Sequence, residues 1–467
     1  MNNGYYIGKV TLISSLGGLL FGFDMAVISG VLPFVQSQFA LNAAEEGWFV
    51  SSALVGAVLG VAFSGELCDR FGRKKLLLLA ALLFLISAVG STLMPTFALL
   101  IYARMLGGIA VGIASNAVPL YLSEIAPSKI RGRLVTCYQL AITFGILVAY
   151  LTNAGLLSLS NNIAPQDLPA DFRFLYVDEV WRGMFSIEVF PALLFFIGLI
   201  FIPESPRWLI QMGRNKDALH IMKKIKKEDE IKQDLEEIHA NQYTKKGSSY
   251  KMLLAPEMRK PLLIGILLPL FSQFSGINAI IYYGPSILKE AGLNLNNAFL
   301  GQILLGTVNM LFTFIAVWKV DSLGRRPLYL TGTVCAAISL FVTGICFYTG
   351  NTESFLLLIS ATIFLASFAF SIGPLKFVIA SEIFPDKIRG RALALSIMVM
   401  WVADTIVGQI TPIMLAAFGA ASTFWFFAFC CLTAFIVVYR MVPETKGKTL
   451  EKIQEMWYKK KTQQVNG

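Results

Sequence analysis

Apolar runs of about 20 residues recur along the whole chain and are separated by shorter polar segments. A helix of that length crosses a hydrocarbon layer of about 30 Å, where backbone groups need hydrogen-bond partners within the chain. The pattern predicts an all-α integral membrane protein of twelve transmembrane helices. Their expected cores are residues 10–32, 48–67, 76–94, 98–121, 134–157, 184–202, 262–287, 298–319, 328–349, 355–381, 392–417 and 422–441.

The composition supports this assignment. Of all residues, 56% are hydrophobic and only 15% are charged. The mean hydropathy of +0.66 lies outside the range that is typical of soluble domains. The first apolar run has no small-residue cleavage pattern and contains Asp24, so we interpret it as a membrane helix and not as a signal peptide.

The basic residues gather on one side of the predicted membrane. Alternating helices place both termini and most of the Lys and Arg residues on the same side, with only Arg173, Arg182 and Lys289 opposite. Cytoplasmic loops carry such an excess of positive charge, which predicts a multi-pass membrane protein with both termini in the cytoplasm. This bias explains the net charge of +10 without a nucleic-acid partner.

Several chemical functions have no support in the sequence. The six cysteines fall in predicted helices or at their cytoplasmic ends, and suggest neither an external disulfide nor a metal site. The segment Gly447-Lys448-Thr449 lacks the earlier glycine of a phosphate-binding loop, because position 442 is Val. We therefore expect no cofactor, no metal, no enzymatic activity and no ATP-driven pumping by this chain alone.

Three segment pairs indicate that the chain is built from two related halves. Ser123–Arg133 reads SEIAPSKIRGR and Ser381–Arg391 reads SEIFPDKIRGR, identical at nine of eleven positions. In the same order, DRFGRK echoes DSLGRR, and PESPR echoes PETKG. The repeats predict six-helix bundles at residues 1–202 and 262–441, a cytoplasmic helical linker at 203–261 and a cytoplasmic tail at 442–467.

These motifs also carry a family resemblance. The ordered set DRFGRKK, RMLGGIAVG, YLSEIAPSKIRGR, PESPRWL, QFSGINAIIYY, DSLGRRP, SEIFPDKIRGR and PETKGKTLEKI resembles the sugar porter family of the major facilitator superfamily. The resemblance implies the major facilitator fold and proton-coupled symport of a monosaccharide or related polyol by alternating access, with a monomer as the functional unit. A facilitative uniporter, a carrier of an acidic sugar and a non-transporting nutrient sensor remain alternatives.

Ionisable residues inside spanning helices are costly and usually functional. Three of them, Asp24, Arg104 and Glu188, lie in the first half. An Asp beside an Arg stays ionised until the two separate and then becomes a proton acceptor. The resemblance assigns proton coupling to these three positions, and a static structural pair is the alternative.

The second half has its own buried charges, Lys376 and Asp404, which have no expected counterpart in the family. They are expected either to form an interhelical salt bridge with each other or to act on the solute or the coupling, with Lys376 receiving an anionic group.

A sugar site needs amide side chains that donate and accept hydrogen bonds, together with aromatic walls. The resemblance assigns solute contacts to Gln139, Gln273, Asn278, Asn309 and Trp401, and places Tyr282 and Tyr283 near the external gate. Phe377 is a further expected solute contact. Two positions depart from the family pattern: Ser272 replaces the first Gln of a QQ pair, and Phe377 replaces a Trp. A polyol, an inositol or an acidic sugar therefore remains open as the solute.

The cytoplasmic motifs place carboxylates beside arginines at helix ends. Ion pairs between neighbouring helices there are expected to hold the cytoplasmic side closed and to part when it opens, while simple anchoring at the interface is the alternative. The residues of this predicted cytoplasmic gate are Asp69, Arg73, Glu124, Arg131, Asp321, Arg325, Glu382 and Arg389.

Overall fold

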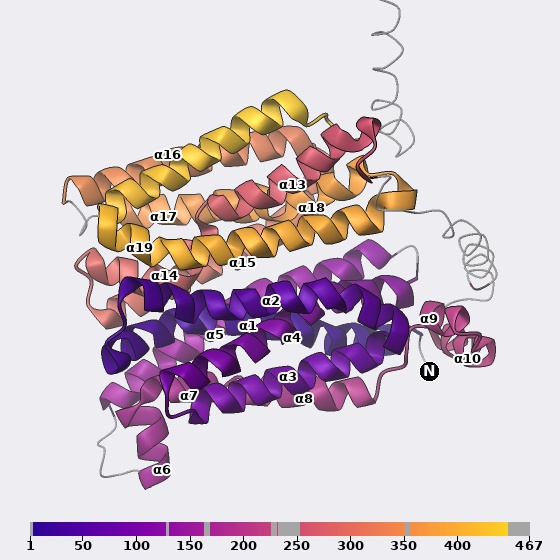
Figure 1. Cartoon of the computed structure of the whole chain (residues 1–467), viewed down its shortest axis with the longest axis horizontal. Helices are drawn as coiled ribbons and strands as arrows, with labels where there is room; N and C mark the ends of the chain where they lie inside the picture. Colours follow the sequence, from indigo (N-terminus) through magenta and orange to yellow (C-terminus); the bar gives the residue numbers. More distant parts are fainter. Residues whose placement is uncertain are drawn as a thin grey trace, which may run out of the picture. The chain divides into compact units, whose positions relative to one another are not determined.

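The structure is a computed structural model that describes residues 3–127, 130–162, 169–225, 231, 253–350 and 355–446. Within these ranges the chain is helical and contains no strand (Figure 1). The helices of the first part are α1 (Asn3–Phe39), α2 (Ala43–Phe71), α3 (Arg73–Leu93), α4 (Phe97–Ile125), α5 (Arg131–Asn162), α6 (Ala170–Arg173), η2 (Phe174–Asp178), α7 (Val180–Ser186), α8 (Val189–Ile200), α9 (Pro206–Gln211) and α10 (Asn215–Ile225). Those of the second part are η4 (Pro256–Met258), α13 (Arg259–Phe274), α14 (Ile277–Glu290), α15 (Leu295–Leu323), α16 (Arg325–Tyr348), α17 (Phe355–Ser367), η5 (Phe368–Ile372), α18 (Gly373–Ile383) and α19 (Asp386–Met441).

Eleven helical stretches of the described chain are long and apolar enough to cross a membrane, judged by length and composition. The last of them, Ile388–Met441, runs through a kink at Gly419, where φ is 75° and ψ is 167°. A helix cannot continue through that conformation, so the stretch contains two spans. The predicted all-α fold with twelve transmembrane helices is confirmed.

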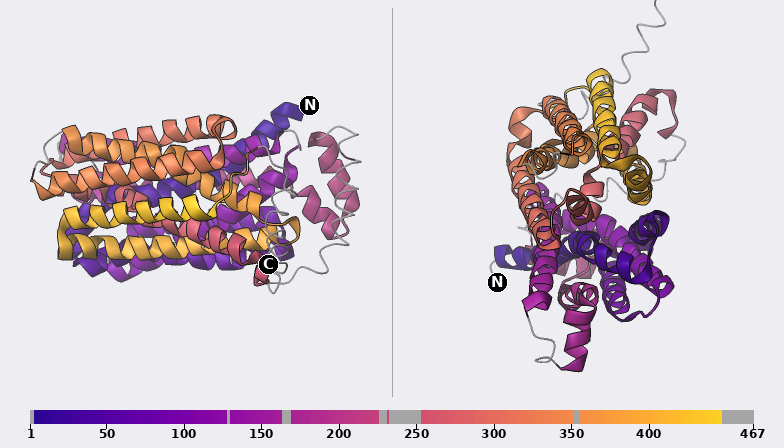
Figure 2. Two further views of the ribbon diagram at one scale, coloured as in Figure 1. Left: turned by 90° about the horizontal axis from the view of Figure 1, so that it is seen from above. Right: turned by 90° about the vertical axis from the view of Figure 1, so that its left-hand side faces the viewer.

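The described helices form two compact units. The first comprises residues 1–241 together with 281–306, and the second comprises 242–280 together with 307–467. Within the first unit α2 lies along α4, α1 lies along α5, and α3 packs against α4 and α8. Within the second, α16 and α13 each pack along α19, and α17 packs on α16. Figure 2 shows the helices of each unit running side by side.

Glycines allow the closest of these contacts in the first unit. A Cβ atom at Gly112 of α4 would lie 2.9 Å from the Cα of Gly60 in α2, and one at Gly108 would lie 2.9 Å from the Cα of Ala53. Any side chain there would force α2 and α4 apart. The backbones approach so closely because both helices present small residues at this seam.

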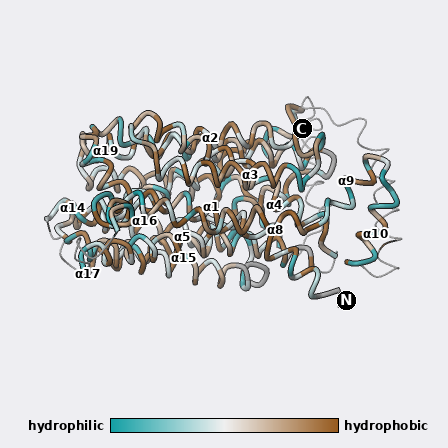
Figure 3. The backbone as a smooth tube through the Cα atoms, turned by 90° about the horizontal axis from the view of Figure 1, so that it is seen from below, coloured by the Kyte–Doolittle hydropathy of each residue, from teal (hydrophilic) through white to brown (hydrophobic). Residues whose placement is uncertain are grey.

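A short helical pair follows the sixth span. Ser205 caps α9 by accepting a hydrogen bond from the Trp208 amide, and Trp208, Leu209 and Met222 form a small buried cluster between α9 and α10. The exposed positions of α10 are mostly charged or polar, so the pair contrasts with the apolar spans in hydropathy (Figure 3). The Trp208 indole donates to the Asp69 carbonyl at 2.9 Å, which fixes α9 to the end of α2.

Candidate functional site

A buried ion pair joins the first and fourth spans of the first unit. Arg104 of α4 donates through Nη1 to Oδ1 of Asp24 in α1 at 2.5 Å, and each residue is only 1% exposed. The guanidinium also lies over the Phe185 ring of α7, 5.7 Å from its centroid. Three helices therefore enclose this pair, away from bulk water.

Glu188 joins the same group because the sixth span is interrupted there. Pro191 has no amide hydrogen to donate, and the Phe190 amide instead bonds to the Ile187 carbonyl at 3.3 Å, so α7 and α8 are separated at residues 187–188. The interruption holds Glu188 at 1% exposure, where the charges of Asp24 and Arg104 both act on it. Within the described residues, Oε1 of Glu188 and Oδ2 of Asp24 have no hydrogen-bond partner.

Two buried carboxyl groups thus lie within the electrostatic influence of one guanidinium, which is bonded to Asp24. A single Arg compensates one carboxylate, and a second ionised carboxylate in the same apolar surroundings would be strongly unfavourable. The arrangement can therefore hold a proton on one carboxyl group and release it when the geometry changes. The structure brings together the three charged residues that the sequence analysis selected in the first half.

A second polar group lies in the second unit, around a break in the seventh span. Gly276 has a φ of +84° and separates α13 from α14. Across the break, the Asn278 amide donates to Oε1 of Gln273 at 3.0 Å, and it also donates to Oδ1 of Asp404 in α19 at 2.6 Å. Lys376 of α18 donates to the Ser272 hydroxyl at 2.9 Å.

The tenth span is distorted just before Lys376. A π-helical turn, η5, leads into α18, whose second residue is Pro374 and cannot donate a backbone hydrogen bond. The wider turn accommodates the proline while the helix continues. Lys376 then lies over the ring of Phe377, 5.3 Å from its centroid, and over that of Phe368 at 5.9 Å.

Lys376 and Asp404, which were expected either to pair with each other or to act on the solute, are each bonded to a different polar side chain. Lys376 is bonded to Ser272 and Asp404 to Asn278, while the Asp404 charge still acts on the Lys376 ammonium. Trp401 lies almost one turn before Asp404 on α19 and is 1% exposed. Three predicted solute-binding positions therefore lie in this polar group, Gln273, Asn278 and Phe377, together with Ser272, which was a possible one.

The remaining predicted solute-site residues are placed on other helices. Asn309 is buried on α15 of the second unit, whereas Gln139 is exposed on α5 of the first. Tyr282 and Tyr283 of α14 are buried in the first unit, where the Tyr282 hydroxyl donates to the Met25 sulfur at 3.7 Å.

At one end of the first unit, a carboxylate and arginine network connects α2, α3, α4 and α9. Arg73 donates through Nη2 to Oε1 of Glu124 at 2.9 Å. Its guanidinium also forms ion pairs with Oε2 of Glu124 at 2.9 Å and with Oδ1 of Asp69 at 3.2 Å. The Ser205 hydroxyl donates to Glu124 at 2.5 Å. Three predicted gate residues are thus in contact within one unit.

The second unit has a related network. Arg325 donates through Nε to Oε1 of Glu382 at 3.2 Å and forms an ion pair with it through Nη2 at 3.1 Å. Arg389 donates to the Phe384 carbonyl. The side chains of the two other predicted gate residues, Arg131 and Asp321, lie outside the described part of the chain.

Two further glutamates, Glu204 and Glu444, adjoin these networks, one in each unit, and were not among the predicted gate residues. Glu204 accepts from the backbone amides of Arg73 and Lys74, and Glu444 accepts from those of Arg325 and Arg326. The repeated PES and PET segments were the signal that marked them.

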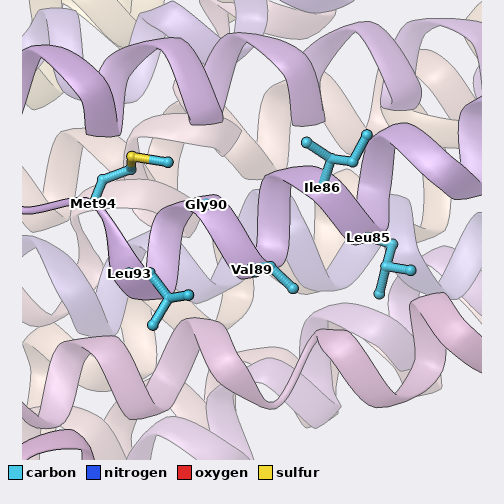
Figure 4. A pocket seen from close by; sticks show the side chains of 6 residues that line it. All are labelled: Leu85, Ile86, Val89, Gly90, Leu93 and Met94. Atoms are coloured by element: carbon cyan, nitrogen blue, oxygen red, sulfur yellow. The ribbon is translucent and has the colours of Figure 1, made fainter.

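An apolar pocket on α3 is a poor candidate for a sugar site. Figure 4 shows its lining, which consists of Leu85, Ile86, Val89, Gly90, Leu93 and Met94. None of these side chains offers a hydrogen-bond donor to a hydroxyl group, and Ile86, Val89 and Leu93 are exposed. On a membrane-spanning helix such a surface suits lipid.

Twelve spans in two related halves, with charged groups buried inside both, define a polytopic transporter of the major facilitator class. Residues 10–457 match the family described as "Sugar (and other) transporter". The chain belongs to this family, whose members are transporters and not enzymes, and it is a multi-span membrane protein.

Known relatives extend over almost the entire chain. The arabinose-proton symporter of Bacillus subtilis strain 168 is 39% identical over 459 residues, which cover 97% of this chain and 96% of that protein. The D-xylose-proton symporter of Escherichia coli strain K12 is 37% identical over 498 residues, covering 99% and 98%. The partially occluded, inward-open structure of the xylose transporter XylE from E. coli has a TM-score of 0.81 and 35% identity, covering 95% of this chain and 100% of that one.

Proposed function

We propose that this protein is a secondary active transporter that carries a monosaccharide or a related polyol together with a proton by alternating access. The observation that carries the proposal is the buried group of Asp24, Arg104 and Glu188, in which Arg104 is bonded to one carboxyl group and acts electrostatically on a second. The names of the relatives support the same chemistry, because both are sugar-proton symporters.

In the proposed cycle, solute and proton bind from outside, and protonation of Asp24 weakens its bond to Arg104. Loss of that bond releases the first and fourth spans from each other, since a neutral carboxyl group no longer compensates the guanidinium. The cytoplasmic networks around Glu124 and Glu382 then part and allow inward release. The polar group around Gln273 and Asn278, together with Gln139, Asn309 and Trp401, supplies the solute contacts.

The proposal includes the arrangement of the chain in the membrane. The predominance of Lys and Arg in the loops on the side of the termini supports cytoplasmic ends. The repeats support two six-helix bundles at 1–202 and 262–441, with a linker at 203–261 and a tail at 442–467. The complete set of predicted sites in one chain supports a functional monomer.

The test is transport by purified protein in liposomes, with L-arabinose, D-xylose, D-glucose and myo-inositol as solutes. An inward proton gradient is expected to drive accumulation of at least one solute and to be dissipated by it. Asp24→Asn is expected to abolish accumulation and to retain counterflow, because exchange of solute needs no net proton movement. Asp178→Asn, which alters an exposed carboxylate paired with Arg173 at 3.3 Å, is the matched control and should behave as the unmodified protein.

Two results would contradict the proposal. Downhill solute flux without proton movement would identify a facilitative uniporter. Full accumulation by Asp24→Asn would show that Asp24 and Arg104 are a static structural pair.

A further inference from the structure

The second unit contains one buried cation and one buried anion in the same polar group. Lys376 is 8% exposed and Asp404 is 3% exposed, and they lie on different helices, α18 and α19. The Asp404 carboxylate acts electrostatically on the Lys376 ammonium and favours its charged form. Each is also bonded to a different polar side chain, Ser272 or Asn278.

Asp404 determines which hydrogen-bond donors and acceptors of Asn278 and Gln273 remain for a solute. An ionised carboxylate only accepts, so it bonds to the NH₂ group of Asn278 and fixes the orientation of that amide. The other hydrogen of this NH₂ group goes to Oε1 of Gln273. Asn278 is then left with an acceptor for a solute, and Gln273 is left with donors.

Lys376 acts in the same way on Ser272. An ammonium only donates, so the Ser272 hydroxyl oxygen accepts its hydrogen bond. The aromatic faces of Phe377 and Phe368 lie near the same ammonium and give it further electrostatic stabilisation. Both charges are therefore stabilised by partners within the protein, and neither requires a charged ligand.

We propose that Lys376 and Asp404 form a charge-compensated pair that fixes the donor and acceptor pattern of the solute site and restricts it to uncharged polyhydroxyl solutes. A sugar acid would bring an additional negative charge into a buried site whose own charges already sum to zero, and such a charge is costly. The inference rests on the proposed sugar-carrier function, but it concerns selectivity and not proton coupling.

The experiment compares binding of D-glucose and D-glucuronate, which differ by a carboxylate at one carbon, with D-xylose, L-arabinose and myo-inositol as further neutral probes. Binding is measured on purified protein by titration calorimetry without a proton gradient. The unmodified protein is expected to bind at least one neutral solute and to bind D-glucuronate at least tenfold more weakly than the best of them.

Variants then separate the two charges. Asp404→Asn keeps the shape and leaves the cation uncompensated, so its preference should shift at least tenfold toward D-glucuronate. Lys376→Met leaves the anion uncompensated and should weaken both classes of ligand. The double variant Lys376→Met/Asp404→Asn should recover neutral binding relative to either single variant. Thr405→Val is the matched control on α19, because the Thr405 hydroxyl bonds to the Trp401 carbonyl of its own helix.

Binding of D-glucuronate by the unmodified protein as tightly as any neutral solute would overturn the inference and identify Lys376 as an anion ligand. An unchanged preference in folded Asp404→Asn would also overturn it. If that variant does not fold, the comparison of D-glucose, D-glucuronate and the other neutral probes on the unmodified protein still decides. Loss of accumulation in Asp24→Asn is a separate readout, so failure of selectivity and failure of symport are distinguishable.

Discussion

Gly107 of α4 lies nearly one turn after Arg104 and packs against Ser87 beside Asp24. A Cβ at this position would lie 2.5 Å from the Ser87 hydroxyl oxygen and 3.5 Å from Oδ1 of Asp24. Overpacking of this kind costs about 1–3 kcal/mol. We expect Gly107→Ala to lower the melting temperature of the purified protein. We also expect it to reduce proton-driven accumulation in liposomes several-fold.

Two variants test whether the cause is the proposed contact. Gly155→Ala on α5 adds the same methyl group where nothing lies within 4 Å, and should leave accumulation unchanged. Ser87→Ala/Gly107→Ala removes the hydroxyl that the new methyl group meets, and should recover part of the lost activity. Normal accumulation by Gly107→Ala alone would contradict this account.

Single residues differ in how far the sequence reveals them. Asp24, Arg104, Glu188, Lys376 and Asp404 could be selected because charges within apolar runs are conspicuous. Their hydrogen-bond partners could not be predicted, because these depend on which faces of separate helices pack against each other. The hydrogen bond from Asn278 to Asp404, for example, depends on the helix break at Gly276 and on the rotation of α19 about its axis. Neither can be predicted from hydropathy.

At the scale of elements, the spans themselves were predictable and their interruptions were not. The thickness of a bilayer fixes the length of an apolar run, so twelve spans followed from the sequence. The interruptions at Glu188, at Gly276 and in η5 leave hydropathy unchanged, because they lie inside apolar runs. Each interruption has a proline or a glycine at or near it that could have indicated it in the sequence: Pro191, Gly276 and Pro374.

Gly276 forms the break between α13 and α14. Its φ of +84° costs a residue with a Cβ about 1–2 kcal/mol, and that Cβ would also lie 2.6 Å from the Phe427 ring. Gly276→Ala should therefore separate Asn278 from Gln273, weaken sugar binding at least tenfold and lower the melting temperature.

Gly292 provides the matched control for backbone strain alone. It has a φ of +94°, and nothing lies within 4 Å of its Cβ position. Gly292→Ala should lower the melting temperature modestly and leave sugar binding intact, as measured by calorimetry. Equal losses of binding in the two variants would show that the contact with Phe427 is unimportant.

At the scale of the molecule, the internal repeat builds the same helix cap in both units. Gly72 and Gly324 precede α3 and α16 and have no side chain to cap them. Glu204 and Glu444 replace that cap, each by accepting from the first two backbone amides of the helix. A carboxylate at a helix N-terminus is also stabilised by the helix dipole.

The cap around Glu444 is expected to make stability depend on pH. Burial acts to raise the pKa of Glu444, but hydrogen bonds from the backbone amides of Lys446, Arg325, Arg326 and Thr445 outweigh burial, so the pKa is lowered overall. A lowered pKa in the folded state means that this contribution is complete above the unfolded pKa of about 4.3 and disappears as the pH falls through the folded value. Glu444→Gln should reduce stability at pH 7 by about 0.5–2 kcal/mol, and the difference should shrink below about pH 4.3.

Melting curves of the unmodified protein and of Glu444→Gln across this pH range provide the measurement. Asp217→Asn removes an exposed carboxylate that pairs with Arg214 at 2.7 Å, and serves as the control. Exposed pairs contribute little, so its difference from the unmodified protein should be small at every pH. A deficit of Glu444→Gln that grew toward low pH would contradict the cap, because a group with a lowered pKa stabilises the fold only while it is ionised.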